Sequence, residues 1–185
     1  MNKLISLVLL SLAFNAEASD WKLAGYADSE ATKDQFLYYD TESIIKNNGN
    51  VTFWVKAIER RQLDKAVNSK KLNKIYLEET AEKIAKYYAP PIYSTKRYQK
   101  YVSDPKVYLD SVIENTLYET VVNKSDPPIK AKYLWEIDCK SKQIRALQIN
   151  LSNAKDNISI FHGQSHWTYI SPDTNTESWH ELFCI

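Results

Sequence analysis

The chain has 185 residues and an almost balanced charge, with 24 Lys and Arg against 23 Asp and Glu, for a formal net charge of +1. This length fits a single domain, and no Gly/Ser-rich or Pro-rich linker divides it. A net charge this close to zero indicates no class of partner by itself. Three glycines and thirteen tyrosines favour regular structure with short connections over flexible tails.

Residues 1–18 have the features of a secretory signal peptide. A short basic start, Met1-Asn2-Lys3, precedes an apolar run from Leu4 to Phe14, and Ala16-Glu17-Ala18 has the small-x-small pattern of a cleavage site. The apolar run is too short for a membrane span, so we expect no transmembrane segment. Cleavage would leave residues 19–185 as one exported domain, in the periplasm, on the outer surface or secreted, where nucleic acid is not an expected partner.

The only cysteines are Cys139 and Cys184, and export places them in an oxidising environment. An even pair in such a chain predicts a disulfide, whereas free thiols would belong to a reducing cell. The closed loop would stabilise the fold by about 4 kcal/mol in the chain-entropy model. No C-x-x-C motif is present, which argues against a thiol oxidoreductase, and no further ligands at zinc spacing accompany the two thiols.

The first part of the exported chain has the pattern of strands joined by turns. Residues 36–40 are rich in aromatic side chains and predict a strand. Residues 47–50, Asn-Asn-Gly-Asn, predict a turn, because Asn and Gly tolerate positive φ. Residues 51–58 then alternate and predict a second strand, whose apolar face is formed by Val51, Phe53, Val55 and Ala57.

The middle of the chain, about residues 60–130, predicts a helical insert. Apolar side chains recur at three- and four-residue steps from Leu63 to Tyr88, where a proline pair ends the pattern. A second helix begins more clearly, because Asp104 can cap it and Pro105 suits the first helical position. Apolar side chains at helical steps continue to Val121, and a second proline pair follows.

The strand period returns after the insert. Residues 133–139 alternate, and Cys139 falls on the apolar face. Lys140-Ser141-Lys142 predicts a hairpin turn, and Ser171 and Pro172 predict the cap and the first residue of a short C-terminal helix. The fold class is therefore α+β: an antiparallel sheet with a helical insert between strands, a short C-terminal helix and one disulfide. Three further strands are expected at residues 143–149, 157–161 and 166–170.

Short motifs lie on both sides of the predicted insert. They are Trp21, Tyr38-Tyr39-Asp40, Ser43-Ile44, Gly49 and Trp54-Val55-Lys56 before it, and Glu136-Ile137-Asp138-Cys139, Arg145, Gly163, Trp167, Ile170, Pro172 and Phe183-Cys184 after it. In the order of these motifs and the placing of the cysteines, the chain resembles the surface-adhesin protein E family of small secreted or surface-attached bacterial proteins. The resemblance implies a compact sheet-and-helix domain with a disulfide matching Cys139 to Cys184. The family's name refers to binding of host extracellular-matrix and plasma glycoproteins.

The resemblance covers roughly residues 21–59 and 131–185. The chain departs from the family pattern in two respects. The segment between these regions is longer and more helical, and the lipid-attachment cysteine of some members is missing. Many members carry the domain with no known role, so the fold transfers better than the function.

The insert has an excess of positive charge, because the chain from Arg60 to Lys106 has twelve Lys and Arg against five Asp and Glu. Tyrosines are interleaved with these cations, and such a surface could contact a host glycoprotein, an acidic glycan or an envelope protein. The alternative is a solvated helical face with tyrosines packed beneath it. The candidate partner-binding residues are Arg60, Arg61, Lys70, Lys71, Lys74, Lys96, Arg97 and Lys100.

The residues with catalytic potential do not form a set that indicates an enzyme. His162 and His166 have H-x-x-x-H spacing, but Gly163 and the strand pattern place them across a turn, so we expect no metal site and no cofactor. No G-x-S-x-G motif is present. Three carboxylates are expected on polar faces or in turns and not as an acid/base pair: Asp40, Glu136 and Asp138.

Two hypotheses of function follow from the sequence. The first is a non-catalytic, adhesin-like binding module, secreted or held at the bacterial envelope, that contacts a host or envelope macromolecule through the basic insert. The second is a periplasmic accessory subunit of an envelope machine, with the insert as its docking element. Exposure of the protein at the cell surface would distinguish the first hypothesis from the second.

Overall fold

The computed structural model describes residues 19–27, 34–69, 79, 94–96, 105–125, 127–152 and 158–185. The predicted signal peptide, residues 1–18, lies outside these ranges, as does the later part of the first predicted helix. The fold class is confirmed: the structure is α+β, with one antiparallel sheet, helices between strands and a short C-terminal helix. In the described part of the chain, no helix is long and apolar enough to cross a membrane.

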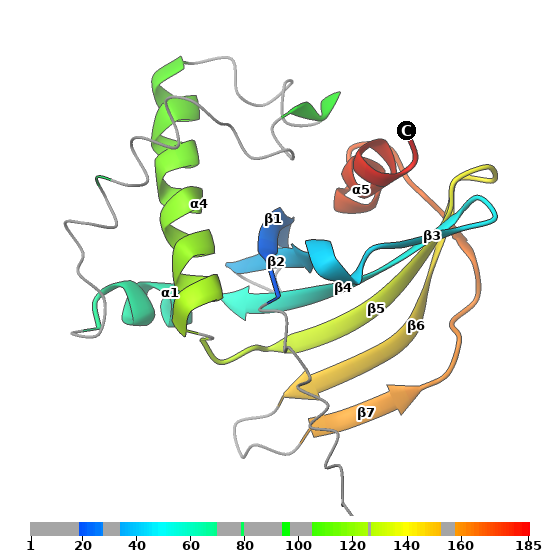
Figure 1. The fold of residues 1–185 in the computed structure, drawn as a ribbon, viewed down its shortest axis with the longest axis horizontal. Coiled ribbons are helices and arrows are strands. Elements are labelled where there is room, and N and C mark those ends of the chain that lie inside the picture. The colour runs from blue at the N-terminus through cyan, green and yellow to red at the C-terminus, as the bar shows by residue number, and fades with distance from the viewer. Residues whose placement is uncertain are drawn as a thin grey trace, which may run out of the picture.

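The sheet has the strand order β1-β2-β4-β5-β6-β7 (Figure 1). In addition, β3 pairs with β4, and β8 pairs with β6. All of these pairings are antiparallel. β4 and β5 are neighbours, so the helical insert leaves the sheet and returns beside its point of departure. The strands are β1 (Trp21–Ala27), β2 (Gln35–Asp40), β3 (Ile45–Asn47), β4 (Asn50–Glu59), β5 (Ala131–Asp138), β6 (Gln143–Ser152), β7 (Ile158–His162) and β8 (Thr168–Tyr169).

Three α-helices complete the described part of the fold: α1 (Arg60–Val67), α4 (Pro105–Ser125) and α5 (Asn175–Phe183). The predicted start of the second helix at Pro105 is confirmed. The capping residue proposed for it, Asp104, lies outside the described residues. A 3-10 turn, η1 (Thr41–Ser43), follows β2.

The predicted start of the C-terminal helix was wrong. α5 begins at Asn175, and its cap is Thr174, whose hydroxyl accepts a hydrogen bond from the Glu177 amide at 3.3 Å. The chain cannot be helical directly after Pro172, because Asp173 has the left-handed φ of +55°. The strand predicted at residues 166–170 is also shorter, since only β8 pairs with the sheet.

The sheet divides the hydrophobic core into two clusters. Phe36 and Tyr38 of β2 pack with α1 and α4 on one face, and the alternating residues Leu37 and Tyr39 pack toward α5 on the other. Figure 1 shows β1 and β2 between α4 and α5. The predicted apolar face of the second strand is confirmed, because all four of its residues are buried in the cluster beneath α5: Val51, Phe53, Val55 and Ala57.

Side chains of α4 bind the backbone of the edge strand β1 at its first residues. Asn123 accepts a hydrogen bond from the Trp21 amide at 2.8 Å and donates one to the Trp21 carbonyl at 3.0 Å. One turn earlier, Glu119 accepts from the Leu23 amide at 2.7 Å. Four residues along a helix and two residues along a strand both span roughly 6 Å. The two α4 side chains, four residues apart, therefore reach strand residues that are two apart.

Side chains of α5 bind the later residues of the same strand. Trp179 donates its indole N–H to the Ala24 carbonyl at 2.8 Å, and Asn175 donates its amide to the Tyr26 carbonyl at 2.6 Å. Along β1, the helix side chains therefore bind the odd-numbered residues 21 and 23 in the first half and the even-numbered residues 24 and 26 in the second half. This change requires the β-bulge found between Leu23 and Gly25.

Gly25 is the residue that permits this arrangement. Its φ is +147°, and a Cβ added to it would lie 2.4 Å from the Asn175 side-chain oxygen. A larger residue would therefore be strained and would displace the hydrogen bond from Asn175 to the strand. The absence of a side chain at Gly25 lets α5 approach the backbone closely.

The predicted disulfide is confirmed. Cys139 and Cys184 are bonded, with 5.3 Å between their Cα atoms and a sequence separation of 45. Cys139 follows β5 directly, and its amide donates to the Gly49 carbonyl at 3.0 Å. The bond therefore ties the residue that follows α5 to the turn at the end of β5.

Candidate functional site

Two of the predicted partner-binding residues make ion pairs within the chain. The Arg60 guanidinium lies 2.5 Å from a Glu114 carboxylate oxygen and over the Phe36 ring, 4.7 Å from its centroid. The neighbouring Arg61 pairs with Glu59. Arg60 therefore contributes to joining α1, α4 and β2.

A second contact joins the same two helices. The Tyr118 hydroxyl of α4 donates to Asp64 of α1 at 2.6 Å. Burial and the hydrogen bond to Asp64 raise the pKa of Tyr118 well above its usual range, so the hydroxyl stays protonated and keeps donating. The predicted partner-binding residues outside the described ranges are Lys70, Lys71, Lys74, Arg97 and Lys100.

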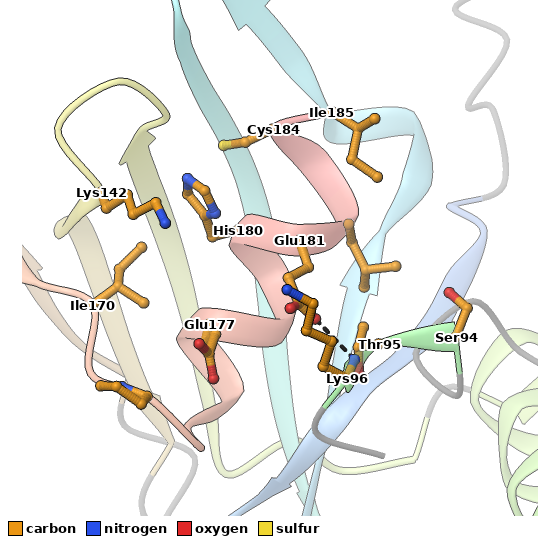
Figure 2. A pocket seen from close by; sticks show the side chains of 12 residues that line it. Ser94, Thr95, Lys96, Lys142, Ile170, Glu177, His180, Glu181, Cys184 and Ile185 are labelled. Atoms are coloured by element: carbon orange, nitrogen blue, oxygen red, sulfur yellow. Dashed lines mark hydrogen bonds between the residues drawn. The ribbon is translucent and has the colours of Figure 1, made fainter. Parts of the chain in front are cut away.

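The remaining predicted residue, Lys96, lines a cleft beside α5 with a cavity volume of about 680 Å³ (Figure 2). Four parts of the chain form its lining. They are the short described segment 94–96 of the insert, the hairpin turn at Lys142, the segment containing Ile170 and Pro172, and α5 with the residues after it. We call this space the α5 cleft.

Specific contacts fix the walls of the α5 cleft. The Lys96 amide donates to the Glu181 carboxylate at 3.1 Å, which Figure 2 shows as a dashed line. A ring nitrogen of His180 lies 3.2 Å from the Cys139 carbonyl oxygen, and the Ile170 amide donates to the Lys142 carbonyl at 3.0 Å. Together with the disulfide, these contacts hold segments that are far apart in sequence around one space.

The lining of the α5 cleft has mixed charge. Lys96 and Lys142 contribute positive charge, and Glu177 and Glu181 contribute negative charge. In Figure 2 the Lys142 side chain extends from the hairpin toward His180. The other wall residues include the apolar Ile170, Pro172, Leu182 and Ile185 and the polar Ser94, Thr95 and His180. Such a lining offers contacts to a ligand that carries both signs of charge and apolar groups.

The three carboxylates considered in the sequence have local structural contacts. Asp40 accepts from the Glu42 amide at 3.2 Å and begins the 3-10 turn. Asp138 accepts from the Ser141 and Lys140 amides, and these hydrogen bonds lower the pKa of Asp138. Glu136 forms a two-point pair with Arg145, at 2.6 Å and 2.7 Å. All three therefore have partners in a turn or on the sheet.

The structure places His166 in the exposed segment before β8 and His162 at the end of β7. The described residues contain no group of three His, Cys, Asp or Glu side chains that could hold a metal ion. Sequence reasoning missed the contribution of α5, in particular Glu177, His180 and Glu181. The signal was available, because a bond from residue 184 to residue 139 brings the C-terminal helix to the predicted hairpin turn.

Comparisons with protein-family models, with curated proteins and with solved structures find no significant match to the chain. The resemblance to the surface-adhesin protein E family therefore rests on the motifs in the sequence.

Proposed function

We propose that the protein is an exported, non-catalytic binding module of the bacterial envelope that holds a segment of a partner protein in the α5 cleft. The composition of the cleft carries this proposal. Lys96 and Lys142 are balanced by Glu177 and Glu181, and the remaining lining combines apolar side chains with the polar Ser94, Thr95 and His180. A polypeptide offers charges of both signs together with apolar side chains, so it matches such a lining.

An acidic glycan is a weaker match to this cleft, because it would favour an excess of cations. Among the predicted partner-binding residues, Lys96 lies in the cleft lining, while Arg60 and Arg61 contact Glu114 and Glu59. The proposal therefore assigns partner contact to Lys96 and assigns the two arginines to the stability of the fold.

Two further observations favour an exported binding module over an intracellular protein. The chain begins with the pattern of a signal peptide, and its two cysteines form a disulfide beside the cleft. The family that the sequence resembles is named for binding host glycoproteins. The disulfide also restrains the cleft wall before a partner arrives, which lowers the entropy lost on binding.

A charge reversal with a matched control tests the proposal. Lys142 and Lys140 are both exposed in the same hairpin turn, but only Lys142 lines the α5 cleft. The exported domain would be titrated against immobilised plasma and extracellular-matrix glycoproteins by surface plasmon resonance. We expect Lys142→Glu to weaken a saturable interaction about tenfold, equivalent to about 1.4 kcal/mol, and Lys140→Glu to leave it unchanged.

Two outcomes would contradict the proposal. Equal binding by both variants would remove the cleft from the interaction, and loss of binding after enzymatic deglycosylation of the partner would show recognition of glycan instead of polypeptide. Cell fractionation addresses the compartment separately. A protein found only in the periplasm and protected from protease on intact cells would favour the accessory-subunit hypothesis.

A further inference from the structure

Two hairpin turns lie side by side at one end of the sheet. The Cys139 amide of the β5–β6 turn donates to the Gly49 carbonyl of the β3–β4 turn at 3.0 Å, and Asn50 is the register partner of Asp138. Figure 1 shows both turns at the same end of the sheet. We call residues 45–49 and 139–142 together the basic tip.

The basic tip has an excess of positive charge. Its three lysines, Lys46, Lys140 and Lys142, are exposed, and its sequence contains no Asp or Glu. Within the described part of the chain, none of the three forms a salt bridge. Asp138, at the base of the second turn, accepts hydrogen bonds from the Lys140 and Ser141 amides.

An apolar side chain lies beside these cations. Ile45 directly precedes Lys46 in β3, and its side chain is 63% exposed. Isoleucine is among the residue types that are most often buried, yet Ile45 belongs to neither core cluster. The basic tip therefore presents an aliphatic group and positive charge together.

A groove with the opposite character lies between α1 and α4. Its cavity volume is about 340 Å³, and three apolar side chains line it: Val67, Ile113 and Leu117. The charged residues of its lining are all acidic: Asp64, Asp110 and Glu114. We call this space the α1–α4 groove.

The three carboxylates of the α1–α4 groove differ in their contacts. Glu114 pairs with Arg60, and Asp64 accepts a hydrogen bond from Tyr118. Asp110 is exposed and forms no salt bridge with any other residue that the structure describes. Asp110 is therefore the carboxylate that is best placed to meet a cation from outside the molecule.

The groove and the tip lie far apart on the molecule. In Figure 1, where the longest axis is horizontal, α1 and α4 lie at one end and the two hairpin turns lie at the other. The basic tip is thus too distant to fill the groove of its own chain, but the tip of a second copy is free to do so. Their charges and their apolar groups are complementary.

We propose that the basic tip of one copy of the protein binds the α1–α4 groove of another copy. Ile45 would contact the apolar lining of the groove, and Lys46 would lie beside Asp110. Each added copy leaves one tip and one groove open, so the association is head-to-tail and open-ended. An acidic glycan or a lipid surface would bind the tip alone and leave the groove unused. The inference does not depend on the function proposed for the α5 cleft.

Analytical ultracentrifugation of the exported domain, without any added partner, tests the proposal. A contact of this size belongs to the weak class, so we expect a dissociation constant of about 0.1 mM. The average mass should rise from that of one copy at about 10 µM to more than that of two copies at about 1 mM. Raising the salt concentration from about 0.05 M to about 0.5 M should weaken the association several-fold, because salt screens exposed charges.

A charge exchange locates the contact. Lys46→Glu and Asp110→Lys should each weaken self-association about tenfold, because each places like charges at the interface. An equimolar mixture of the two variants should associate as well as the unmodified chain. In the mixture, each unmodified surface can meet an unmodified partner, and each substituted surface can meet a substituted one of opposite charge.

Two further variants separate the contributions of charge and packing. Ile45→Ser should weaken the association about tenfold at every salt concentration, because it removes the apolar contact. Lys65→Glu is the matched control for Lys46→Glu, since both change the net charge equally. Lys65 is exposed on α1 but does not line the groove, so this variant should not weaken the association.

Four results would overturn the proposal. A chain that stays monomeric up to about 1 mM has no such contact. Growth that neither charge variant weakens would run through another surface, and a mass that levels off at two copies would show a closed dimer. Binding of an added basic amphipathic peptide to an otherwise monomeric chain, abolished by Asp110→Lys, would identify a different protein as the occupant of the groove.

Discussion

α4 and α5 bind the same edge strand with different chemistry. α4 uses Glu119 and Asn123, and one of these is a buried carboxyl group. α5 uses the neutral donors Asn175 and Trp179, and the disulfide fixes the residue that follows it to the sheet. The α4 contact should therefore depend on pH, whereas the α5 contact should depend on the redox state of the cysteines.

The largest effect is expected from removal of the disulfide on the α5 side. Cys139→Ser, Cys184→Ser and the double variant should each lower the free energy of unfolding by about 4 kcal/mol, because each opens the same 45-residue separation. Urea denaturation measures this. The double variant should cost no more than either single variant, and additive losses would show that the cysteines act independently of their bond.

The second effect concerns Glu119 on the α4 side. Burial raises the pKa of Glu119 to about 7, against the opposing effect of the hydrogen bond from Leu23. Because the folded-state pKa lies above the unfolded-state value, the contribution to stability is fully present below about pH 4.5 and is lost as the pH rises through about 7. The loss should reach about 3 kcal/mol.

Comparison with Glu119→Gln isolates this pH dependence. Glutamine can accept the same hydrogen bond from Leu23 but does not titrate, so the variant should lose less stability between pH 5 and about 8. Chemical denaturation at a series of pH values would measure the difference. Parallel pH profiles for the two proteins would show that the pKa of Glu119 is the same in the folded and unfolded states, which would contradict the prediction.

The third effect is smaller and tests the close approach of α5. Gly25→Ala should destabilise the fold by about 2 kcal/mol, because the new Cβ would collide with Asn175 and break its hydrogen bond to Tyr26. Gly49→Ala is the matched control. Gly49 also has a positive φ, +85°, but nothing lies within 4 Å of its added Cβ, so it should cost about 1 kcal/mol. Equal losses in thermal unfolding would mean that only the backbone conformation matters at Gly25.

Regular patterns in the sequence predicted much of the sheet. Residues 51–58 alternate without interruption, and the structure buries the predicted face. β1 was not predicted, because its bulge breaks the alternation and buries Leu23 and Ala24 in succession. A search for alternating apolar residues cannot find such a strand, because the alternation changes phase at the bulge.

Local polar chemistry was informative but ambiguous. Ser171 and Pro172 have the right character for a helix start, yet Thr174 and Glu177 have the spacing of a capping box and mark the actual start. The predicted turn after β5 is confirmed without any glycine, because Lys142 adopts a φ of +51° and Asp138 binds two turn amides. The contact of Lys96 with α5 joins residues 85 positions apart, and no local pattern encodes it.

The hydrogen bonds from α4 and α5 to β1 also govern how copies of the molecule can associate. An exposed edge strand is a template on which another chain can add a strand and extend the sheet. At the edge of β1, the amides of Trp21 and Leu23 and the carbonyls of Ala24 and Tyr26 are already bonded to helix side chains. Sheet polymerisation through β1 would have to break these bonds, so the two helices act as a barrier against aggregation at this edge.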